Sequence, residues 1–552
     1  MRAPLLFLAI PIAAAVTSCS SCAKKSSGEG EVAPVVLSPI EPPDGLLGEV
    51  TVASPDTFWS HLQHGAGGLV ALLPMTLGSL VVTFASVDSS VATTIDGASP
   101  AYAAAIAHGA DTGWAVAVKL TDLAHARATL IDGEAARYDG HDDGIWTLLS
   151  RKGGTAPGSS PAQIAISKTG ALVISDSVEH LKAIGPYLVR TMPTLPRGTA
   201  DIDIDVPHAA LSGPLHDRLA AWWTQTRQEK EAQATEAKDK HRRAADFGDP
   251  SGILALADGA VQKRLALMPD LQSTHISISS DATSLTVDAM LTPTEGDGPA
   301  AKWISGLALD DAKPLLNAPS GVITMLTYAT GSDPQATAND FESALKSVLG
   351  ARLNAADTKL AHAAAADFSS GAGNAITASL VAGAMPGVFF VTPAKHPDVA
   401  ARSIHEACEL LDRPAFRAPL ASLLDVSGSS FAGAETPGGA SVSTFSLQRG
   451  STDFVSASWV ARDGNLVFAA GPDGAGLLNA PPSHTWRDDA TVLTRATALG
   501  KNISFAVAAH PVLTSDPDAS LLFAWGRDGS RGHASIASSD VVVRELIRVL
   551  AP

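Results

Sequence analysis

The feature that most restricts the fold of this chain is an order of strands, turns and helices that occurs twice. Each copy has a strand followed by a helix, and then a hairpin that leads into another helix. The hairpin turns are Lys168-Thr169-Gly170 in the first copy and Arg462-Asp463-Gly464 in the second, and each lies between alternating apolar runs. Thr-Gly and Asp-Gly at such places are strong hairpin signals. The pattern predicts an internal duplication.

The match between the copies continues beyond these hairpins. One strand ends in Pro207-His208 and its counterpart ends in Ala509-His510, and each copy then has a second hairpin and a closing apolar helix. We therefore expect two related lobes at residues 46–310 and 320–552. Because the strands come as adjacent hairpins, antiparallel sheets packed with helices are expected, which is an α+β fold. Chance recurrence of hairpin-plus-helix units is the alternative.

The first copy contains an insert, at about residues 212–270, that the second copy lacks. A long helix is predicted over 214–245, with Trp222 and Trp223 on one apolar stripe near its start and mixed charges beyond. Mixed charges at helical spacing are typical of a solvated helix. The segment 247–250 is expected to end it, and a second helix is predicted over 253–267. The insert is interpreted either as a helical hairpin packed on lobe 1 or as an arm for a partner.

The first residues are typical of an export signal. Met1-Arg2 carries one positive charge, and residues 3–16 are almost wholly apolar but too short to span a bilayer. The segment ends in Val16-Thr17-Ser18-Cys19, which resembles the lipobox of bacterial lipoproteins. That resemblance implies cleavage between Ser18 and Cys19 and a diacylglycerol thioether on Cys19, usually with a third acyl chain such as palmitate. An ordinary cleaved secretory signal is the alternative.

The lipoprotein resemblance also implies a location in the cell. Residues 1–18 would be the signal peptide, and Ser20 rather than Asp after the cysteine implies the outer membrane, with the protein facing the periplasm. Residues 19–45 are rich in Ser, Lys, Gly and Pro and are expected to form a disordered tether. The body is similar to uncharacterised two-lobed periplasmic lipoproteins. Of the remaining cysteines, Cys22 and Cys408, nothing local suggests a disulfide.

Composition limits the partners. The net charge is −17, from 39 Lys and Arg against 56 Asp and Glu, and aromatic residues make up 5% of the chain. Nucleic-acid binding needs Lys and Arg to replace condensed counterions, or aromatic platforms for stacking bases. We therefore expect no nucleic-acid partner. The expected partners are the membrane, through the lipid anchor, and either a protein or an apolar ligand.

Two short motifs resemble parts of catalytic or metal sites but are better explained as structure. Ser343-Ala344-Leu345-Lys346 has the S-x-x-K spacing of penicillin-recognising serine enzymes, whose K-T-G follows it, whereas here Lys168-Thr169-Gly170 comes first. Asp201, Asp203 and Asp205 resemble the start of a calcium loop. Val206 and Ser212 stand where such a loop needs Gly and Glu. Alternation places the three carboxylates on one strand face, which is expected to be solvated.

Two further groups of ligand-type residues lead to the same interpretation. His405, Cys408 and Glu409 lie at metal-like helical spacing, but Cys408 belongs to an apolar helix stripe and is expected in the core. The polar segment Asp139–Gly144 is expected to be a turn. We therefore predict no catalytic, cofactor-binding or metal-binding residue.

Three functional classes stay open. The first is a non-enzymatic envelope protein that binds or scaffolds, with no cofactor. The second is a periplasmic carrier of lipid or of another apolar ligand, and the third is an unrecognised hydrolase. An apolar tunnel would favour the carrier, and a cleft with converging Ser, His and carboxylate groups would favour the hydrolase.

Overall fold

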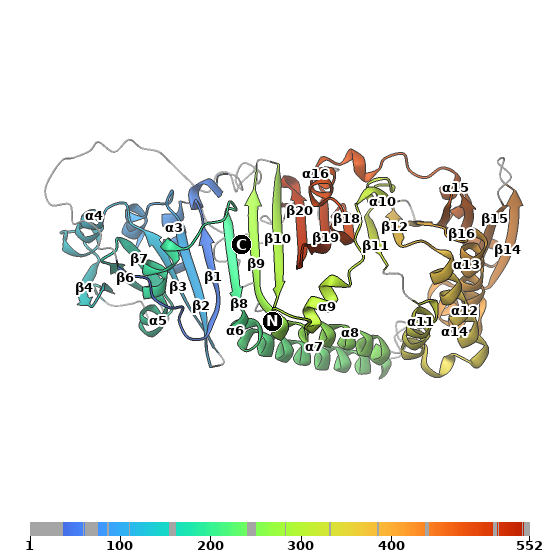
Figure 1. Cartoon of the computed structure of the whole chain (residues 1–552), viewed down its shortest axis with the longest axis horizontal. Coiled ribbons are helices and arrows are strands. Elements are labelled where there is room, and N and C mark those ends of the chain that lie inside the picture. Colours follow the sequence, from blue (N-terminus) through green and yellow to red (C-terminus); the bar gives the residue numbers. More distant parts are fainter. Residues whose placement is uncertain are drawn as a thin grey trace. The chain divides into compact units, whose positions relative to one another are not determined.

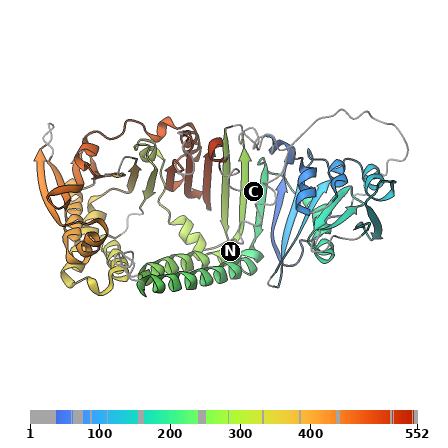
Figure 2. The same ribbon diagram turned by 180° about the vertical axis from the view of Figure 1, so that it is seen from behind.

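The computed structural model describes residues 37–58, 60, 76–85, 88–109, 111–153, 162–239, 250–281, 283–329, 333–382, 386–435, 441–511, 516, 518–543 and 545. The chain combines helices with antiparallel strands that come largely as adjacent hairpins, so the expected α+β class is confirmed (Figures 1 and 2). The chain forms two compact units. Unit 1 takes the described residues of 1–216, 271–292 and 538–552, and unit 2 takes those of 217–270 and 293–537.

Unit 1 contains an antiparallel sheet of ten described strands. Its order is β4-β5-β6-β7-β3-β2-β1-β8-β9-β10. The bounds are β1 Leu46–Val52, β2 Ala101–His108, β3 Asp111–Lys119, β4 Tyr138–Asp143, β5 Trp146–Arg151, β6 Gln163–Ser167, β7 Ala171–Ser175, β8 Ile202–Pro207, β9 Leu271–Ser280 and β10 Ser284–Pro293.

Unit 2 contains a second ten-stranded antiparallel sheet among its described residues. Its order is β14-β15-β16-β17-β13-β12-β11-β18-β19-β20, so every pairing of unit 1 recurs with each strand number raised by ten. The bounds are β11 Ile323–Tyr328, β12 Ala375–Val381, β13 Gly387–Pro393, β14 Gly428–Glu435, β15 Ser441–Arg449, β16 Thr452–Arg462, β17 Asn465–Gly471, β18 Ile503–Ala509, β19 Leu521–Asp528 and β20 Arg531–Ser539, of which the last two residues belong to unit 1.

Local contacts repeat along with the topology. The ring nitrogen Nδ1 of His208, just after β8, donates to the carbonyl of Leu271 at 2.7 Å. His510, just after β18, does the same to the carbonyl of Ala519 at 2.8 Å. In the β16–β17 turn Asp463 and Gly464 both have positive φ, as a type I′ hairpin requires. These repeats support the predicted duplication, while common ancestry of the two halves stays a prediction.

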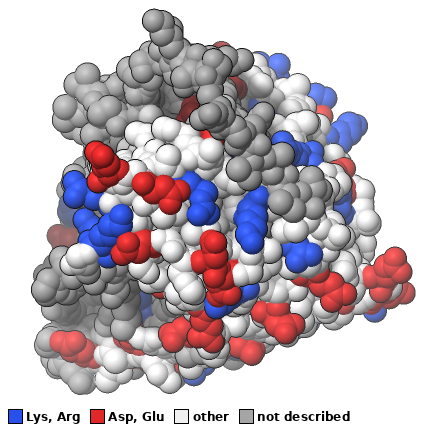
Figure 3. Space-filling model, turned by 90° about the vertical axis from the view of Figure 1, so that its left-hand side faces the viewer, with Lys and Arg blue, Asp and Glu red and all other residues white. Residues whose placement is uncertain are grey.

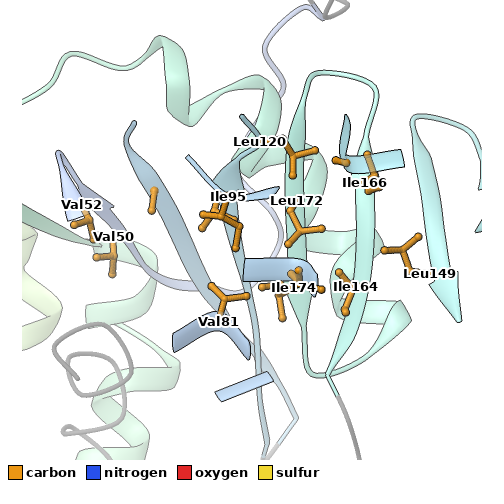
Figure 4. Packing of buried hydrophobic residues seen from close by; sticks show 14 of the residues in the cluster. Val50, Val52, Val81, Ile95, Leu120, Leu149, Ile164, Ile166, Leu172 and Ile174 are labelled. Atoms are coloured by element: carbon orange, nitrogen blue, oxygen red, sulfur yellow. The ribbon is translucent and has the colours of Figure 1, made fainter. Parts of the chain in front are cut away.

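The core of unit 1 lies on both faces of its sheet. One face carries branched side chains from β1 and β8, with Val50 and Ile204 buried, and is covered by α3 (Leu77–Ala85) and η3 (Ser89–Thr94) (Figure 4). The other face is covered by α5 (Val178–Arg190), which buries an apolar stripe. The hydroxyl of Ser177 caps α5 by accepting from the backbone N–H of His180 at 3.0 Å. The short helices α4 (Leu123–Arg127), η4 (Ala128–Asp132), η5 (Met192–Thr194) and α6 (His208–Leu211) complete unit 1.

Unit 2 buries one face of its strands beneath η9 (Trp486–Asp488), α16 (Ala490–Leu499) and α10 (Lys313–Leu316). Trp486 is fully buried there, and its Nε1 donates to Thr324 Oγ1 at 2.7 Å. The other helices of unit 2 are α9 (Pro299–Ser305), α11 (Pro334–Leu349), α12 (Ala355–Gly371), α13 (Pro397–Asp412), α14 (Pro414–Leu424) and α15 (Gly474–Asn479), with the short turns η7 (Met268–Asp270) and η8 (Gly350–Arg352).

The predicted insert forms two long helices, α7 (Pro214–Asp239) and α8 (Pro250–Leu265). They are joined by Trp223 Nε1, which donates to Asp258 at 2.7 Å, and by the Arg227–Asp258 ion pair at 3.0 Å. The expected helix-ending segment falls at residues 247–249, outside the described residues. Trp222 is 43% exposed, so the apolar stripe at the start of α7 is only partly covered.

The compact units divide the chain at places other than the expected lobe boundaries. The lobe limits were set at 46–310 and 320–552, yet nearly all described residues of the insert group with unit 2, and the described residues of 538–552 group with unit 1. The reason for the first difference is packing of α8 on α11. A Cβ on Gly252 would lie 1.6 Å from the carbonyl oxygen of Ser347, so glycine permits this close approach. Sequence spacing carries no signal of that contact.

The surface of unit 1 carries charges of both signs. In Figure 3, Lys and Arg side chains alternate with Asp and Glu side chains across the described part of the face in view. Part of this alternation is ion pairing, as between Lys182 of α5 and Asp143 of β4 at 2.6 Å. Such mixing produces no large field of one sign on that face.

Candidate functional site: an uncovered apolar sheet face

The residues predicted for lipidation and cleavage, Cys19 and Ser18, lie outside the described residues. The serine-enzyme motifs are placed by the structure in different units. Lys168-Thr169-Gly170 is the β6–β7 turn, with Gly170 at φ +84°, in unit 1. In unit 2, Lys346 of α11 pairs with Glu342 one turn earlier. Both assignments agree with a structural role for the two motifs.

The acidic row on β8 is more structured than expected. His275 of β9 reaches two of its carboxylates, with Nδ1 2.8 Å from Asp205 Oδ1 and Nε2 3.2 Å from Asp203 Oδ1. Asp201 accepts from the backbone N–H of Ser280 at 2.6 Å. Burial raises the pKa of Asp203. The expectation of a simply solvated face is therefore wrong, and the row holds β8 against β9 through a histidine that sequence reasoning missed.

The remaining ligand-type residues also have structural contacts. Cys408 lies on the buried side of α13, and burial raises the pKa of its thiol to about 12. His405 contacts the rings of Phe431 and Trp459. The expectation of a turn over Asp139–Gly144 is wrong for most of the segment, because residues 139–143 pair with β5 as strand β4 and only Gly144 lies in the turn. Within the described part of the chain, no three His, Cys, Asp or Glu side chains are grouped so that they could hold a metal ion.

The strand register of unit 2 shows which side chains lie on each face of its sheet. Residues paired across antiparallel strands point to the same face. Thr324 and Leu326 of β11 therefore share a buried face with Ser379, Ala506, Ala508, Leu522 and Ala524. The alternate positions form the opposite face, which we call the open face: Ile323, Met325 and Thr327 of β11; Ile376, Ala378 and Leu380 of β12; Val388 and Phe390 of β13; Phe505, Val507 and Ala509 of β18; and Leu521, Phe523 and Trp525 of β19.

The open face is apolar although it is not buried. All of its members are at least partly exposed, and Met325 reaches 43% and Val388 39%. An antiparallel sheet with one solvated face normally alternates apolar residues inside with polar residues outside. Here the covered face holds mostly small or hydroxyl side chains, and the exposed face holds the large hydrocarbon ones. An uncovered apolar surface of this kind marks an interaction site.

The central strands of unit 1 differ from those of unit 2 in how well this face is covered. Strands β1 and β8 of unit 1 correspond to β11 and β18, and their side chains Val50, Val52, Ile202 and Ile204 are all buried beneath α3 and η3. The matching connection in unit 2, between β11 and β12, forms α11 and α12 instead. Phe368 of α12 packs on Phe390 at the β13 edge of the open face, and among the described residues Met325 on the central strand β11 stays 43% exposed.

Helices frame the open face without covering it. At the β19 edge, Trp525 stacks on Trp303 of α9, with ring centroids 5.0 Å apart and planes at 18°. The guanidinium of Arg264, on α8, lies 4.7 Å from the centroid of the Trp303 ring. The other end of α8 packs on α11 at Gly252. α8 has 16 residues and is about 24 Å long, so it runs from α9 to α11 opposite the strands (Figures 1 and 2).

Helix α8 carries apolar side chains on the same side as Arg264. At 3.6 residues per turn, Ile253, Leu256 and Ala260 project from the same side as Arg264, away from the Asp258 side that binds α7. Ile253 is 52% exposed and Leu256 41%. An open groove of about 410 Å³ lies beside Arg264 and is lined almost wholly by apolar atoms of Leu219, Ala260, Val261, Arg264, Leu265 and Met268. Arg264 links this side of α8 to the open face through Trp303 and Trp525.

The sequence carries a signal for this site. In Ile323-Thr324-Met325-Leu326-Thr327-Tyr328 both faces of the strand are largely apolar or hydroxyl, without the charged positions of a solvated face. That pattern predicts a strand buried on both faces. Which face lacks a cover depends on where α11 and α12 pack, and that depends on contacts between distant segments.

A stability experiment tests whether the open face is uncovered. Met325→Ala is expected to lower the free energy of unfolding by less than about 1 kcal/mol, since little buried area is lost. Ile204→Ala, on the covered counterpart face of unit 1, is expected to cost about 2–5 kcal/mol. Urea titrations of the two variants measure the difference. Equal losses would show that Met325 is packed in the core.

Comparison of the chain with protein-family models, curated proteins and solved structures gives no match. Among the helices of the described residues, none is both long and apolar enough to cross a membrane.

Proposed function

We propose that this protein is a lipid-anchored envelope protein that binds the acyl chains of a lipid on the open face of unit 2. The observation that carries the proposal is the reversal of side-chain size across the sheet. The large apolar side chains face outward in unit 2, whereas Val50 and Val52 of β1 and Ile202 and Ile204 of β8 are buried in unit 1. Burial of such side chains against acyl chains contributes roughly 25 cal/mol per Å² of apolar surface, which favours binding.

The proposed role is carriage or presentation of lipid rather than catalysis. The open face offers hydrocarbon side chains, the thioether of Met325, the hydroxyl of Thr327 and the indole of Trp525 to a ligand, which are groups suited to contact rather than to proton transfer. The lipobox-like sequence ending at Cys19 would attach the chain to a membrane. The expected tether at 19–45 is wrong in its last part, because Ile40 exchanges hydrogen bonds with Thr191 and Arg190 donates to the carbonyl of Ser38. Residues 20–36 would therefore let the body reach away from the membrane. Attachment near a lipid surface is consistent with a ligand drawn from that surface.

A charge placed on the open face tests the proposal. The probe is N-phenyl-1-naphthylamine, a neutral fluorophore that emits strongly in apolar surroundings, added to the full mature chain carrying Cys19→Ser for solubility. Met325→Lys is expected to weaken probe binding at least tenfold, because a ligand that covers the face would desolvate the ammonium group. The matched control is Leu195→Lys, which changes a leucine that is 38% exposed in unit 1.

Two results would contradict the proposal. One is unchanged probe binding in Met325→Lys while the melting temperature is also unchanged. The other is a wild-type dimer, seen by light scattering, that Met325→Lys converts to a monomer, because the open face would then be a contact between two copies. Leu195→Lys is expected to keep both probe binding and oligomeric state.

A further inference from the structure

The edge of the open face at β19 differs chemically from its centre. Two arginines lie there, beside the stacked rings of Trp303 and Trp525. Arg264 of α8 packs over Trp303, and because Trp525 occupies one side of that ring, the guanidinium lies on the other. Arg527 follows Trp525 by two residues on β19 and so projects from the same face of the sheet. A hydrophobic surface with a cationic edge matches an amphiphile with an anionic headgroup.

Both arginines keep their positive charge available. No ion pair joins Arg264 or Arg527 to a carboxylate of the described residues. Arg527 Nη1 donates to the carbonyl of Ser305 at 3.0 Å, which fixes the side chain but does not neutralise it. The nearby acids are already engaged: Asp528 pairs with Arg531 at 3.0 Å, and Asp270 accepts from the backbone N–H of Ala300 at 2.7 Å.

Resting on the proposed function, we infer that the ligand is an anionic phospholipid, with its acyl chains on the open face and its phosphate beside Arg264 and Arg527. The guanidinium group presents paired N–H donors that match phosphate oxygens, and stacking on an aromatic ring holds its plane in place. The width of the face supports two chains rather than one. β13, β12, β11, β18 and β19 lie about 4.8 Å apart, so the face is roughly 19 Å across.

The test compares two soluble lipids that differ only in headgroup. Dioctanoyl phosphatidylglycerol and dioctanoyl phosphatidylcholine compete with N-phenyl-1-naphthylamine for the full mature chain carrying Cys19→Ser. The anionic lipid is expected to displace the probe at a concentration at least tenfold lower than the zwitterionic lipid. Arg264→Gln and Arg527→Gln are each expected to reduce this preference to threefold or less, while displacement by phosphatidylcholine stays unchanged.

The control is Lys263→Gln, which removes a charge from the next position of α8 and is expected to keep the full preference. Equal displacement by the two lipids in the wild type would overturn the headgroup inference while the proposed function still stood. Displacement by oleate that depends on Arg264, without displacement by phosphatidylglycerol, would overturn it in favour of a fatty acid. The proposed function itself would be contradicted by a separate result, namely that Met325→Lys does not weaken binding of the probe.

Discussion

Trp486→Ala is expected to lower the free energy of unfolding of unit 2 by about 3–5 kcal/mol, the range typical of a large aromatic side chain removed from a core. The ring is fully buried between the sheet and α16, and it stacks on His510 with centroids 4.5 Å apart. The substitution also removes the donor to Thr324 Oγ1, whose remaining side-chain contact is Ser379 Oγ at 2.9 Å. A buried hydroxyl that loses a partner adds to the loss of stability.

Chemical denaturation, monitored by circular dichroism, measures this effect. Because the chain has two compact units, two transitions are expected, and only the transition of unit 2 should shift. Trp222→Ala is the matched control: this tryptophan is 43% exposed, so its removal is expected to change stability by less than about 1 kcal/mol. A loss of similar size in both variants would show that Trp486 does not anchor the core of unit 2.

Cys19→Ser is expected to transfer the protein completely from the membrane pellet to the soluble fraction of the envelope. The reason is that serine cannot form the thioether that the lipobox resemblance implies, and several acyl chains anchor a protein far more firmly than one. Fractionation followed by immunoblotting measures the distribution, and intact-mass analysis of the wild type measures the attached lipid. Cys22→Ser is the control and is expected to stay in the pellet. A Cys19→Ser protein that stays in the pellet after signal removal would disprove the anchor.

The local parts of the fold could be predicted from the sequence. The turns around Gly170 and Gly464 were visible because a positive φ selects glycine at defined places in hairpins. The long helices of the insert were visible from charge spacing. Self-comparison of the chain also indicated which strands correspond, and His208 and His510 make equivalent contacts after corresponding strands.

The site could not be predicted in the same way, because it depends on which face of the unit 2 sheet the helices leave exposed. Alternation in β11 shows that two faces exist, and its residues suggest that both are apolar. The position of α8 depends on glycine at 252, which lets it approach α11, and on Arg264 reaching Trp303. His275 was missed for a related reason, because its carboxylate partners lie about seventy residues earlier in the chain. Contacts between distant segments leave no periodic trace in the sequence.

The division of side chains by size across the sheet of unit 2 has a consequence for how this protein can evolve. The small residues Ala506, Ala508 and Ala524 face the helices and determine whether the unit folds. The large residues Met325, Val507 and Phe523 face the other way, and Met325 is 43% exposed. Mutations at the outward positions therefore change the surface offered to a ligand while leaving the core intact. We expect selection for ligand binding to act on the outward positions and selection for stability to act on the inward positions. Binding preference can then change by single substitutions without variants that fail to fold.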